Sequence, residues 1–332
     1  MEVLKKTLYV LLGIIAIMLV VALFLPKERK MHGSIVINAP DYIVFEQVNN
    51  LQKWLGWMPF TDDSSMHTTF EGPPSGVGAK MVWDGKKTGK GTLTIKESVP
   101  YFKIVSDLDF MEQGKALDSW VLSPTEGGIQ VDWTTQITSL SYPVERIMGM
   151  FMNSMMKPYF ERGLNSLKAV SESLPVTFSC SQVCEKTSDE ILAIVIKDSV
   201  TEETIGQRMG INYGILMQFA TKNKLDIAGL PFAEYPQWIV GQKNLVIIGI
   251  PVSKKIKTML PVEMYKIAAS NNVMVSYFGP YEKSAYGHEK INQYIIANKK
   301  EINGFSREVY ISDPQLEPDP TKWETQIFYP IK

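Results

Sequence analysis

This chain has few cysteines, few histidines and almost no net charge. Its 332 residues include 2 cysteines and 3 histidines, and 34 basic residues against 35 acidic ones leave a net charge of −1. Two cysteines cannot form a disulfide-rich scaffold, and the histidines are too scattered for a zinc site. A neutral chain lacks the clustered lysines and arginines of a nucleic-acid-binding face. Phosphate-loop and dinucleotide motifs are also missing. We therefore expect no metal, no cofactor and no nucleic acid partner.

Charge is absent from residues 8–25, an unbroken apolar run that ends at Pro26. At ~1.5 Å per residue, a helix of this length nearly spans the ~30 Å hydrocarbon core of a bilayer. The alternative is a cleaved signal peptide. Its apolar core is usually about 7–15 residues long and ends at a small-residue cleavage site, which residues 23–26 do not resemble. We predict an uncleaved transmembrane helix over residues 7–26.

The basic residues on the two sides of this run are nearly balanced. Lys5 and Lys6 precede it, and Lys27, Arg29 and Lys30 follow it. The excess of positive charge that marks the cytoplasmic side of a membrane therefore does not decide the orientation. A very short basic tail before a first helix usually stays in the cytoplasm. We expect a single-pass membrane protein with its domains outside the cytoplasm, and the side remains open.

The rest of the chain is long enough for two globular domains. Its composition, 45% hydrophobic and 21% charged residues over the whole sequence, is typical of folded protein. We predict a first domain over residues 32–173, a linker over residues 174–189 and a second domain over residues 190–332.

The first domain has the pattern of a curved antiparallel sheet closed by one long helix. The helix is predicted over residues 143–173 from a wide apolar stripe rich in methionine, with a kink at Pro158. Strands are predicted over residues 34–38, 80–83, 89–98, 101–110, 115–122 and 129–137. The last strand alternates cleanly, with Ile129, Val131, Trp133 and Ile137 on one face.

Three parts of this domain resemble the SRPBCC (START/polyketide cyclase-like) superfamily. They are the opening at residues 35–45 with Trp54 and residues 57–60, the Gly-Gly-x-x-Val-x-Trp strand at residues 127–133, and the closing helix. The resemblance covers residues 32–173 and implies a helix-grip fold that holds a hydrophobic small molecule, without implying a reaction. Core filling is the alternative role for the side chains that we expect to line such a cavity: Trp120, Trp133, Met148, Met152 and Met155.

The second domain contains an internal duplication. Residues 218–235 align without gaps to residues 293–310 at a constant offset of 75, with 6 identities in 18 positions. Each copy has the pattern strand, helix, glycine turn, strand, strand. Two such copies side by side predict a pseudo-twofold sheet with a groove between the two helices. The whole protein is thus predicted as α+β.

The duplicated domain resembles the GyrI-like effector-binding domain, the C-terminal part of multidrug-responsive transcription activators. Its Gly-Pro-Tyr segment at residues 279–281 and its Glu-x-Tyr-x-x-Asp-Pro segment at residues 308–314 carry this resemblance. The resemblance implies that Glu308 is buried among aromatic residues and pairs with cationic, apolar ligands, with Trp323 and Tyr281 in the pocket. Glu324 is the rival for this role. The alternative for Glu308 is a solvent-exposed residue near the start of a strand, with no binding role.

Three functions remain open at this stage. The first is a membrane-anchored binding protein for hydrophobic or cationic organic molecules, acting as a sensor or scavenger. The second is a hydrolase of small electrophilic molecules that uses a glutamate as general base, as in some stand-alone GyrI-like proteins. The third is an inhibitor that acts through an unidentified protein partner. We assign no catalytic residue. Cys180 and Cys184 remain unassigned, since a disulfide across so short a loop is easily strained.

Overall fold

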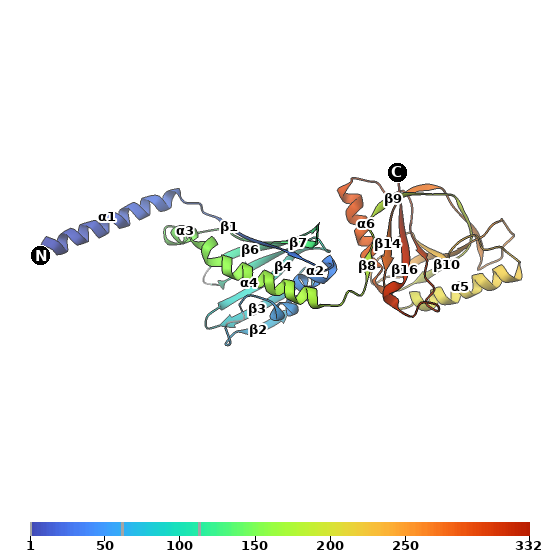
Figure 1. Cartoon of the computed structure of the whole chain (residues 1–332), viewed down its shortest axis with the longest axis horizontal. Coiled ribbons are helices and arrows are strands. Elements are labelled where there is room, and N and C mark those ends of the chain that lie inside the picture. Colours follow the sequence, from blue (N-terminus) through green and yellow to red (C-terminus); the bar gives the residue numbers. More distant parts are fainter. Residues whose placement is uncertain (1, 61–62, 112–113) are drawn as a thin grey trace. The chain divides into compact units, whose positions relative to one another are not determined.

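The structure, a computed structural model, describes residues 2–60, 63–111 and 114–332. The chain divides into two compact units, Met1–Val176 and Thr177–Lys332. Each unit contains its own antiparallel sheet with helices packed on it (Figure 1). The prediction of two α+β domains, a helix-grip domain and a duplicated strand-helix-strand-strand domain, is confirmed.

The first unit begins with helix α1 (Glu2–Phe24). Its stretch Lys5–Phe24 has a mean hydropathy of 2.8, and 6% of the most apolar window is buried. The helix is thus long and apolar enough to cross a bilayer, a property that it shares with signal sequences. Ala22, near its C-terminal end, is fully buried.

The sheet of the first unit has the strand order β1-β7-β6-β5-β4-β3-β2, with antiparallel neighbours throughout. Inward and outward residues alternate along the strands, and the buried face includes Val131 and Trp133 as the sequence predicts. Gly128, with φ of 136°, is the first residue of β7, and a Cβ atom there would lie 2.1 Å from the Ile37 carbonyl oxygen. The strands are β1 (Arg29–Ile37), β2 (His67–Glu71), β3 (Lys80–Gly85), β4 (Gly89–Val99), β5 (Lys103–Asp109), β6 (Lys115–Thr125) and β7 (Gly128–Ile137).

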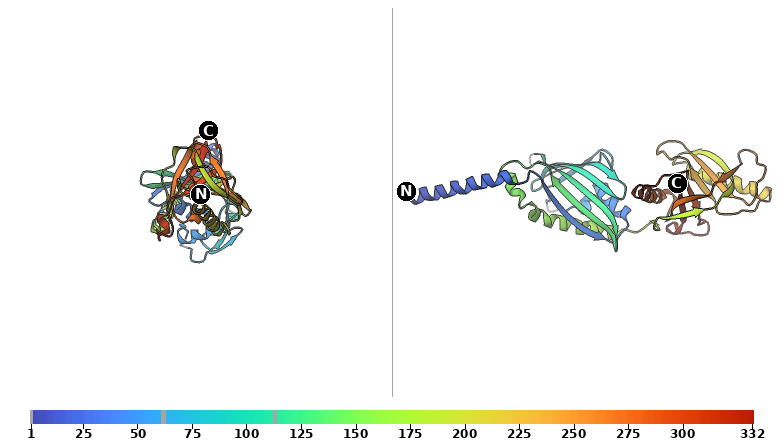
Figure 2. Two further views of the ribbon diagram at one scale, coloured as in Figure 1. Left: turned by 90° about the vertical axis from the view of Figure 1, so that its right-hand side faces the viewer. Right: turned by 90° about the horizontal axis from the view of Figure 1, so that it is seen from above.

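One face of this sheet is covered by helices (Figure 2). Glycine permits the closest approach, because a Cβ atom on Gly163 would lie 2.9 Å from the Trp133 ring and one on Gly33 2.8 Å from Phe160 Cβ. The sheet and its covering helices share one hydrophobic core. The helices of this unit that follow β1 are α2 (Asp41–Asn49), the 3₁₀ helix η1 (Leu51–Gly56), α3 (Val144–Gly149) and α4 (Met152–Ser173).

The single helix predicted over residues 143–173 is wrong in one respect. The structure divides it into α3 and α4, with the break at Met150 and Phe151 rather than at Pro158, which lies inside α4. The apolar periodicity continues across the break. For that reason the hydrophobic pattern does not reveal it.

The second unit has a sheet in the order β13-β10-β12-β11-β15-β16-β14-β8, and β9 also pairs with β14. The two copies of the repeat are β10-α5-β11-β12 and β14-α6-β15-β16, and they meet where β11 pairs with β15. The elements are β8 (Ser179–Cys180), β9 (Cys184–Ser188), β10 (Ile191–Val200), α5 (Ile205–Lys222), β11 (Phe232–Tyr235), β12 (Asn244–Pro251), β13 (Glu263–Ile267), β14 (Ser270–Phe278), η3 (Tyr281–Lys283), α6 (Ala285–Ala297), β15 (Ser306–Tyr310), η4 (Pro320–Lys322) and β16 (Glu324–Ile331).

Residues that are identical in the two copies take the same conformation and contacts. Lys224 and Lys299 both adopt positive φ, 51° and 52°. The preceding residues, Asn223 and Asn298, each donate a side-chain hydrogen bond of 2.9 Å to the carbonyl four residues earlier. The identities in the duplicated segments therefore reflect the shared way in which both helices end and turn toward the next strand.

The linker predicted over residues 174–189 is shorter in the structure. Ser179–Cys180 and Cys184–Ser188 are strands that pair with β14, so these residues belong to the second unit. The segment is polar and short, and its strand character comes from the backbone groups that β14 offers at its edge.

Cys180 and Cys184 are not joined by a disulfide. Cys180 is paired with Tyr277 of β14, and Cys184 is paired with Met274. These two β14 residues are three positions apart, so at ~3.3 Å per residue the two cysteines are separated by about 10 Å along the strand. A disulfide needs Cα atoms within about 7 Å of each other. We therefore expect mild oxidation of the folded protein to leave both thiols open to alkylation. Mass spectrometry of unreduced peptides checks this, and a Cys180–Cys184 cross-linked peptide would contradict the pairing of β8 and β9.

Candidate functional site

The centre of the second sheet lies on the local twofold axis of the duplication. Ala233 on β11 is paired with Glu308 on β15. These two residues are also equivalent in the repeat, because they differ by the same 75 positions as the two copies. The axis therefore passes between them. Only one side chain is charged, and the alanine leaves room beside the carboxylate.

Glu308 is buried, with 5% of its surface exposed, and both of its oxygens accept hydrogen bonds. Tyr235 and Tyr310, which are equivalent in the repeat, donate to Oε2 over 3.0 and 2.8 Å. His288 Nε2 from α6 lies 3.0 Å from Oε1 and is the donor, since a carboxylate can only accept. His288 Nδ1 in turn lies 2.9 Å from the hydroxyl of Tyr329.

The electrostatics of this cluster favour a charged carboxylate. Burial opposes ionisation of Glu308, but the hydrogen bond and charge of His288, with hydrogen bonds from Tyr310 and Ser284, hold its pKa below the usual value. Burial and the charge of Glu308 raise the pKa of Tyr235 and Tyr310 well above the usual value. Both tyrosines therefore remain neutral hydrogen-bond donors to an anion.

Aromatic rings continue outward from this carboxylate. The ring of Tyr281 lies 5.4 Å from that of Tyr310 and 5.1 Å from that of Trp323. Tyr213, on α5, contributes a further edge contact to Tyr310 at 6.4 Å. The predicted site residues Glu308, Tyr281 and Trp323 thus belong to one cluster, in which Tyr310 connects the carboxylate to the other two.

Glu324 lies elsewhere. Glu308 is paired with Ile327, and Glu324 is three residues from Ile327 on the same strand, so alternation places it on the opposite face of the sheet. There it accepts hydrogen bonds from Ser276 at 2.8 Å and Gln326 at 3.3 Å. The structure does not bring it to the Glu308 cluster.

Sequence reasoning missed four members of this cluster: Tyr235, Tyr310, His288 and Tyr329. A signal was available for the first two, which are identical in the two copies of the repeat. Their role follows only once the twofold axis is placed at Glu308. His288 and Tyr329 occur at no recognisable spacing from it.

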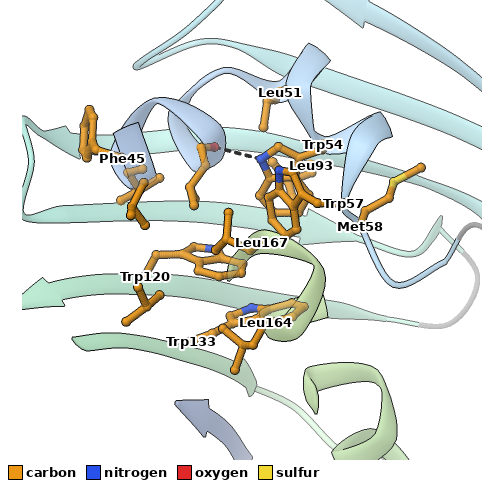
Figure 3. Packing of buried hydrophobic residues seen from close by; sticks show 14 of the residues in the cluster. Phe45, Leu51, Trp54, Trp57, Met58, Leu93, Trp120, Trp133, Leu164 and Leu167 are labelled. Carbon is orange, nitrogen blue, oxygen red and sulfur yellow. Dashed lines mark hydrogen bonds between the residues drawn. The ribbon is translucent and has the colours of Figure 1, made fainter. Parts of the chain in front are cut away.

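In the first unit, the predicted ligand-binding tryptophans are part of a filled core. The rings of Trp120 and Trp133 are stacked with centroids 4.3 Å apart. Trp54 and Trp57 approach Trp120 edge-on at 5.7 and 5.6 Å, and Phe160 of α4 approaches Trp133 at 4.6 Å. Figure 3 shows the indoles converging between the sheet and α4.

A buried carboxylate lies beside the stacked indoles. Asp118, 1% exposed, accepts hydrogen bonds from Trp120 Nε1 at 2.9 Å, Trp133 Nε1 at 2.7 Å and Thr135 Oγ1 at 2.6 Å. Burial raises its pKa to about 6, although these three hydrogen bonds act in the opposite direction. In the sequence, Asp118 is only a polar residue on the otherwise apolar inward face of β6. Nothing in the sequence shows that its hydrogen-bond donors are buried beside it.

The three predicted methionines lie in different surroundings. Met152 is half-buried against the core of the first unit. Met148 and Met155 are 48% and 57% exposed and lie outside that core. A surface pocket of about 140 Å³ opens instead beside Leu51, Phe70 and Ala79. It is smaller than the roughly 300–1,000 Å³ of sites that enclose drug-sized ligands.

Comparison with known proteins finds a family that is similar to the first unit. Residues 28–172 match the protein family described as polyketide cyclase / dehydrase and lipid transport. The match covers 145 of the 332 residues, all within the first unit, which is thus similar to this family. No curated protein matches the chain. The matched residues include strands β1 to β7 and the tryptophan core.

Several solved structures are similar to parts of the chain. A complex of EcmrR with DNA shares 18% identity, covering 57% of this chain and 70% of that chain with a TM-score of 0.41. A hydrolase from Listeria innocua shares 10% identity, covering 46% and 92% with a TM-score of 0.35. The Aha1 dimer from Colwellia psychrerythraea shares 17% identity, covering 43% and 96% with a TM-score of 0.31.

Proposed function

We propose that this chain is a membrane-anchored small-molecule-binding protein whose second unit accepts an apolar organic cation at Glu308. The observation that carries the proposal is the buried carboxylate of Glu308, whose pKa lies below its usual value and which lies among aromatic rings. Such a site offers charge complementarity together with cation–π contact from the faces of Tyr281 and Trp323.

His288 is the partner that a ligand would replace in this proposal. Its Nε2 lies 3.0 Å from Oε1 of Glu308, and a ligand cation would take this position. Because Glu308 exposes only 7% of its side chain, a ligand reaches it after neighbouring side chains have moved. The Glu308 carboxylate is already removed from water in the protein without ligand, so binding adds little further desolvation of this charge. A cation therefore gains more from the site than a neutral molecule of the same shape.

The hydrolase alternative requires a different carboxylate. A general base for water works best with a pKa raised toward neutrality. The pKa of Glu308 lies below its usual value, and both oxygens already accept hydrogen bonds. These properties favour binding over catalysis, and turnover remains an outcome of the test.

We expect Glu308→Gln to weaken binding of an apolar organic cation about 10- to 100-fold, or roughly 1–3 kcal/mol, the scale for a charge-assisted partner. A neutral ligand of the same shape should lose much less affinity. Calorimetry with such a cation/neutral pair measures the difference. Glu324→Gln is the matched control, since it makes the same chemical change on the opposite face of the sheet.

Two results would overturn this assignment. Equal losses for the cation and the neutral ligand in Glu308→Gln would remove the charge from the binding mechanism. Consumption of the ligand by wild-type protein, with Glu308→Gln retaining binding but losing turnover, would instead establish the hydrolase. Product detection over hours, run beside the calorimetry, separates these cases.

The membrane anchor is part of the same proposal. It is supported by the apolar stretch Lys5–Phe24, and we infer that this helix is a single-pass span rather than a cleaved signal. We further propose that both units lie outside the cytoplasm. A reporter fusion at the C-terminus, read in compartments on the two sides of the membrane, tests the orientation.

For the first unit we infer a capacity to bind apolar molecules, supported by the description of the family that residues 28–172 match. The space between its sheet and α4 is occupied by Trp120, Trp133 and Phe160. An apolar ligand would therefore displace these rings or bind at the pocket beside Leu51 and Phe70.

A further inference from the structure

An apolar surface is exposed where α3 leads into α4. Around the short helix α3 and the break that follows it, large hydrophobic side chains point to solvent instead of joining the core of the first unit. We call this surface the α3 face. It consists of Tyr142, Val144, Met148, Met150, Phe151 and Met155, which are 44%, 63%, 48%, 43%, 59% and 57% exposed.

The α3 face is held beside the C-terminal end of α1. The Tyr142 hydroxyl donates to the carbonyl oxygen of Leu19 over 3.0 Å, and Arg146 Nη1 reaches the carbonyl oxygen of Ala22 over 3.4 Å. The Leu140 amide donates to the Lys27 carbonyl oxygen over 2.7 Å. These contacts join the segment before α3 to both the helix and the residues that follow it.

The contacts also set a depth for this surface. Leu19 precedes the last residue of α1, Phe24, by five positions, or about 7.5 Å along a helix. Interfacial helices bury their apolar faces about 5–10 Å into the boundary between headgroups and acyl chains. If α1 spans a bilayer and ends near its surface, the Tyr142 hydroxyl lies within this boundary.

The chemistry of the surface fits the same boundary. Tyrosine and arginine combine an apolar body with a polar end, and both are favoured where hydrocarbon meets water. The Arg146 guanidinium lies 5.6 Å from the centre of the Tyr142 ring. Lys27, Arg29 and Lys30 follow α1 directly, at the level where headgroup phosphates occur.

We propose that the α3 face is a membrane-docking surface, inserted into the interfacial region of the phospholipid bilayer that α1 spans. This inference rests on the membrane anchoring proposed above. It goes further, because an anchor alone would leave the first unit free to tumble at the end of its tether. Docking through α3 instead holds the unit against the bilayer in one orientation.

The test uses full-length protein reconstituted into vesicles of phosphatidylcholine and phosphatidylglycerol. In a background with Cys180→Ser and Cys184→Ser, single cysteines are introduced as Ile15→Cys, Met148→Cys and Phe102→Cys and labelled with an environment-sensitive fluorophore. Phe102 is 46% exposed and lies at the start of β5, at the other end of the sheet from α1. It reports an aqueous position in the same unit.

We expect the labels at positions 15 and 148 to be blue-shifted and quenched by lipids brominated on their acyl chains, and the label at position 102 to show neither effect. Adding Phe151→Glu and Met155→Glu should abolish quenching at position 148 and leave it intact at position 15. A quenched label at position 15 with an aqueous label at position 148 would overturn docking alone. An aqueous label at position 15 would overturn the anchor and docking together.

Discussion

Trp120→Ala is expected to lower the free energy of unfolding of the first unit by about 3–5 kcal/mol, the usual cost of removing a large buried aromatic side chain. Trp120 is fully buried and stacks on Trp133. Its removal opens a cavity among the other indoles and takes one hydrogen-bond donor from Asp118. Urea denaturation followed by circular dichroism measures the loss.

Phe102→Ala is the matched control for this change. It also truncates an aromatic residue of the first unit, but one that is 46% exposed, and should cost less than about 1 kcal/mol. A small loss of stability for Trp120→Ala, together with lost binding of an apolar fluorophore, would contradict the description of Trp120 as core. It would show that the indole lines a cavity that ligands occupy.

Asp118→Asn is expected to change how the stability of the first unit depends on pH. Burial raises the pKa of Asp118 from 3.8 to about 6. Between these two pH values, the folded state therefore holds a proton that the unfolded state has released. The stabilisation from this proton is complete below about pH 4 and is lost as pH rises through about 6. The loss amounts to roughly 3 kcal/mol at neutral pH.

Asparagine is neutral at every pH and cannot lose this proton. The stability of Asp118→Asn relative to wild type should therefore rise by roughly 3 kcal/mol between about pH 4 and pH 7. Tryptophan fluorescence is a suitable probe, since 5 of the 7 tryptophans belong to the first unit. Any constant penalty from placing an amide donor near Trp120 Nε1 leaves this difference unchanged.

Asp132→Asn is the control, since Asp132 lies on the half-exposed face of the neighbouring strand β7. It makes the same chemical change outside the tryptophan core. A stability difference between Asp118→Asn and wild type that stays flat from about pH 4 to pH 7 would mean that the buried carboxyl keeps an ordinary pKa. Its three hydrogen bonds would then balance its burial.

Local sequence patterns predicted much of this protein. The apolar run of α1, the alternation of β7 and the constant offset of 75 between the repeats each depend on residues close together in the chain or on direct comparison of two segments. Glu308, Tyr281 and Trp323 were expected as site residues because of the resemblance to the GyrI-like domain. Period, length and internal repetition are one-dimensional properties, so a sequence displays them without a structure.

Other features depend on which residues the fold brings together. The register of β11 and β15 sets Ala233 opposite Glu308, and only this pairing reveals that Tyr235 and Tyr310 converge on one carboxylate from the two repeats. Glu324 lies on β16, the strand next to that of Glu308, yet strand alternation puts its side chain on the other face of the sheet. A shift of the register by one residue would exchange the faces, and the sequence shows the repeat without its register.

The same limit applies to the first unit. The stripe of methionines and aromatic residues over residues 143–173 predicts helix, but it reveals neither the break at Met150 and Phe151 nor the exposure of Met148 and Met155. Likewise, the sequence shows Asp118 only as a polar residue on the apolar face of β6. The fold brings Trp120, Trp133 and Thr135 around it as hydrogen-bond donors. Periodicity identifies which face of an element is apolar, whereas tertiary packing decides what covers that face, or leaves it exposed.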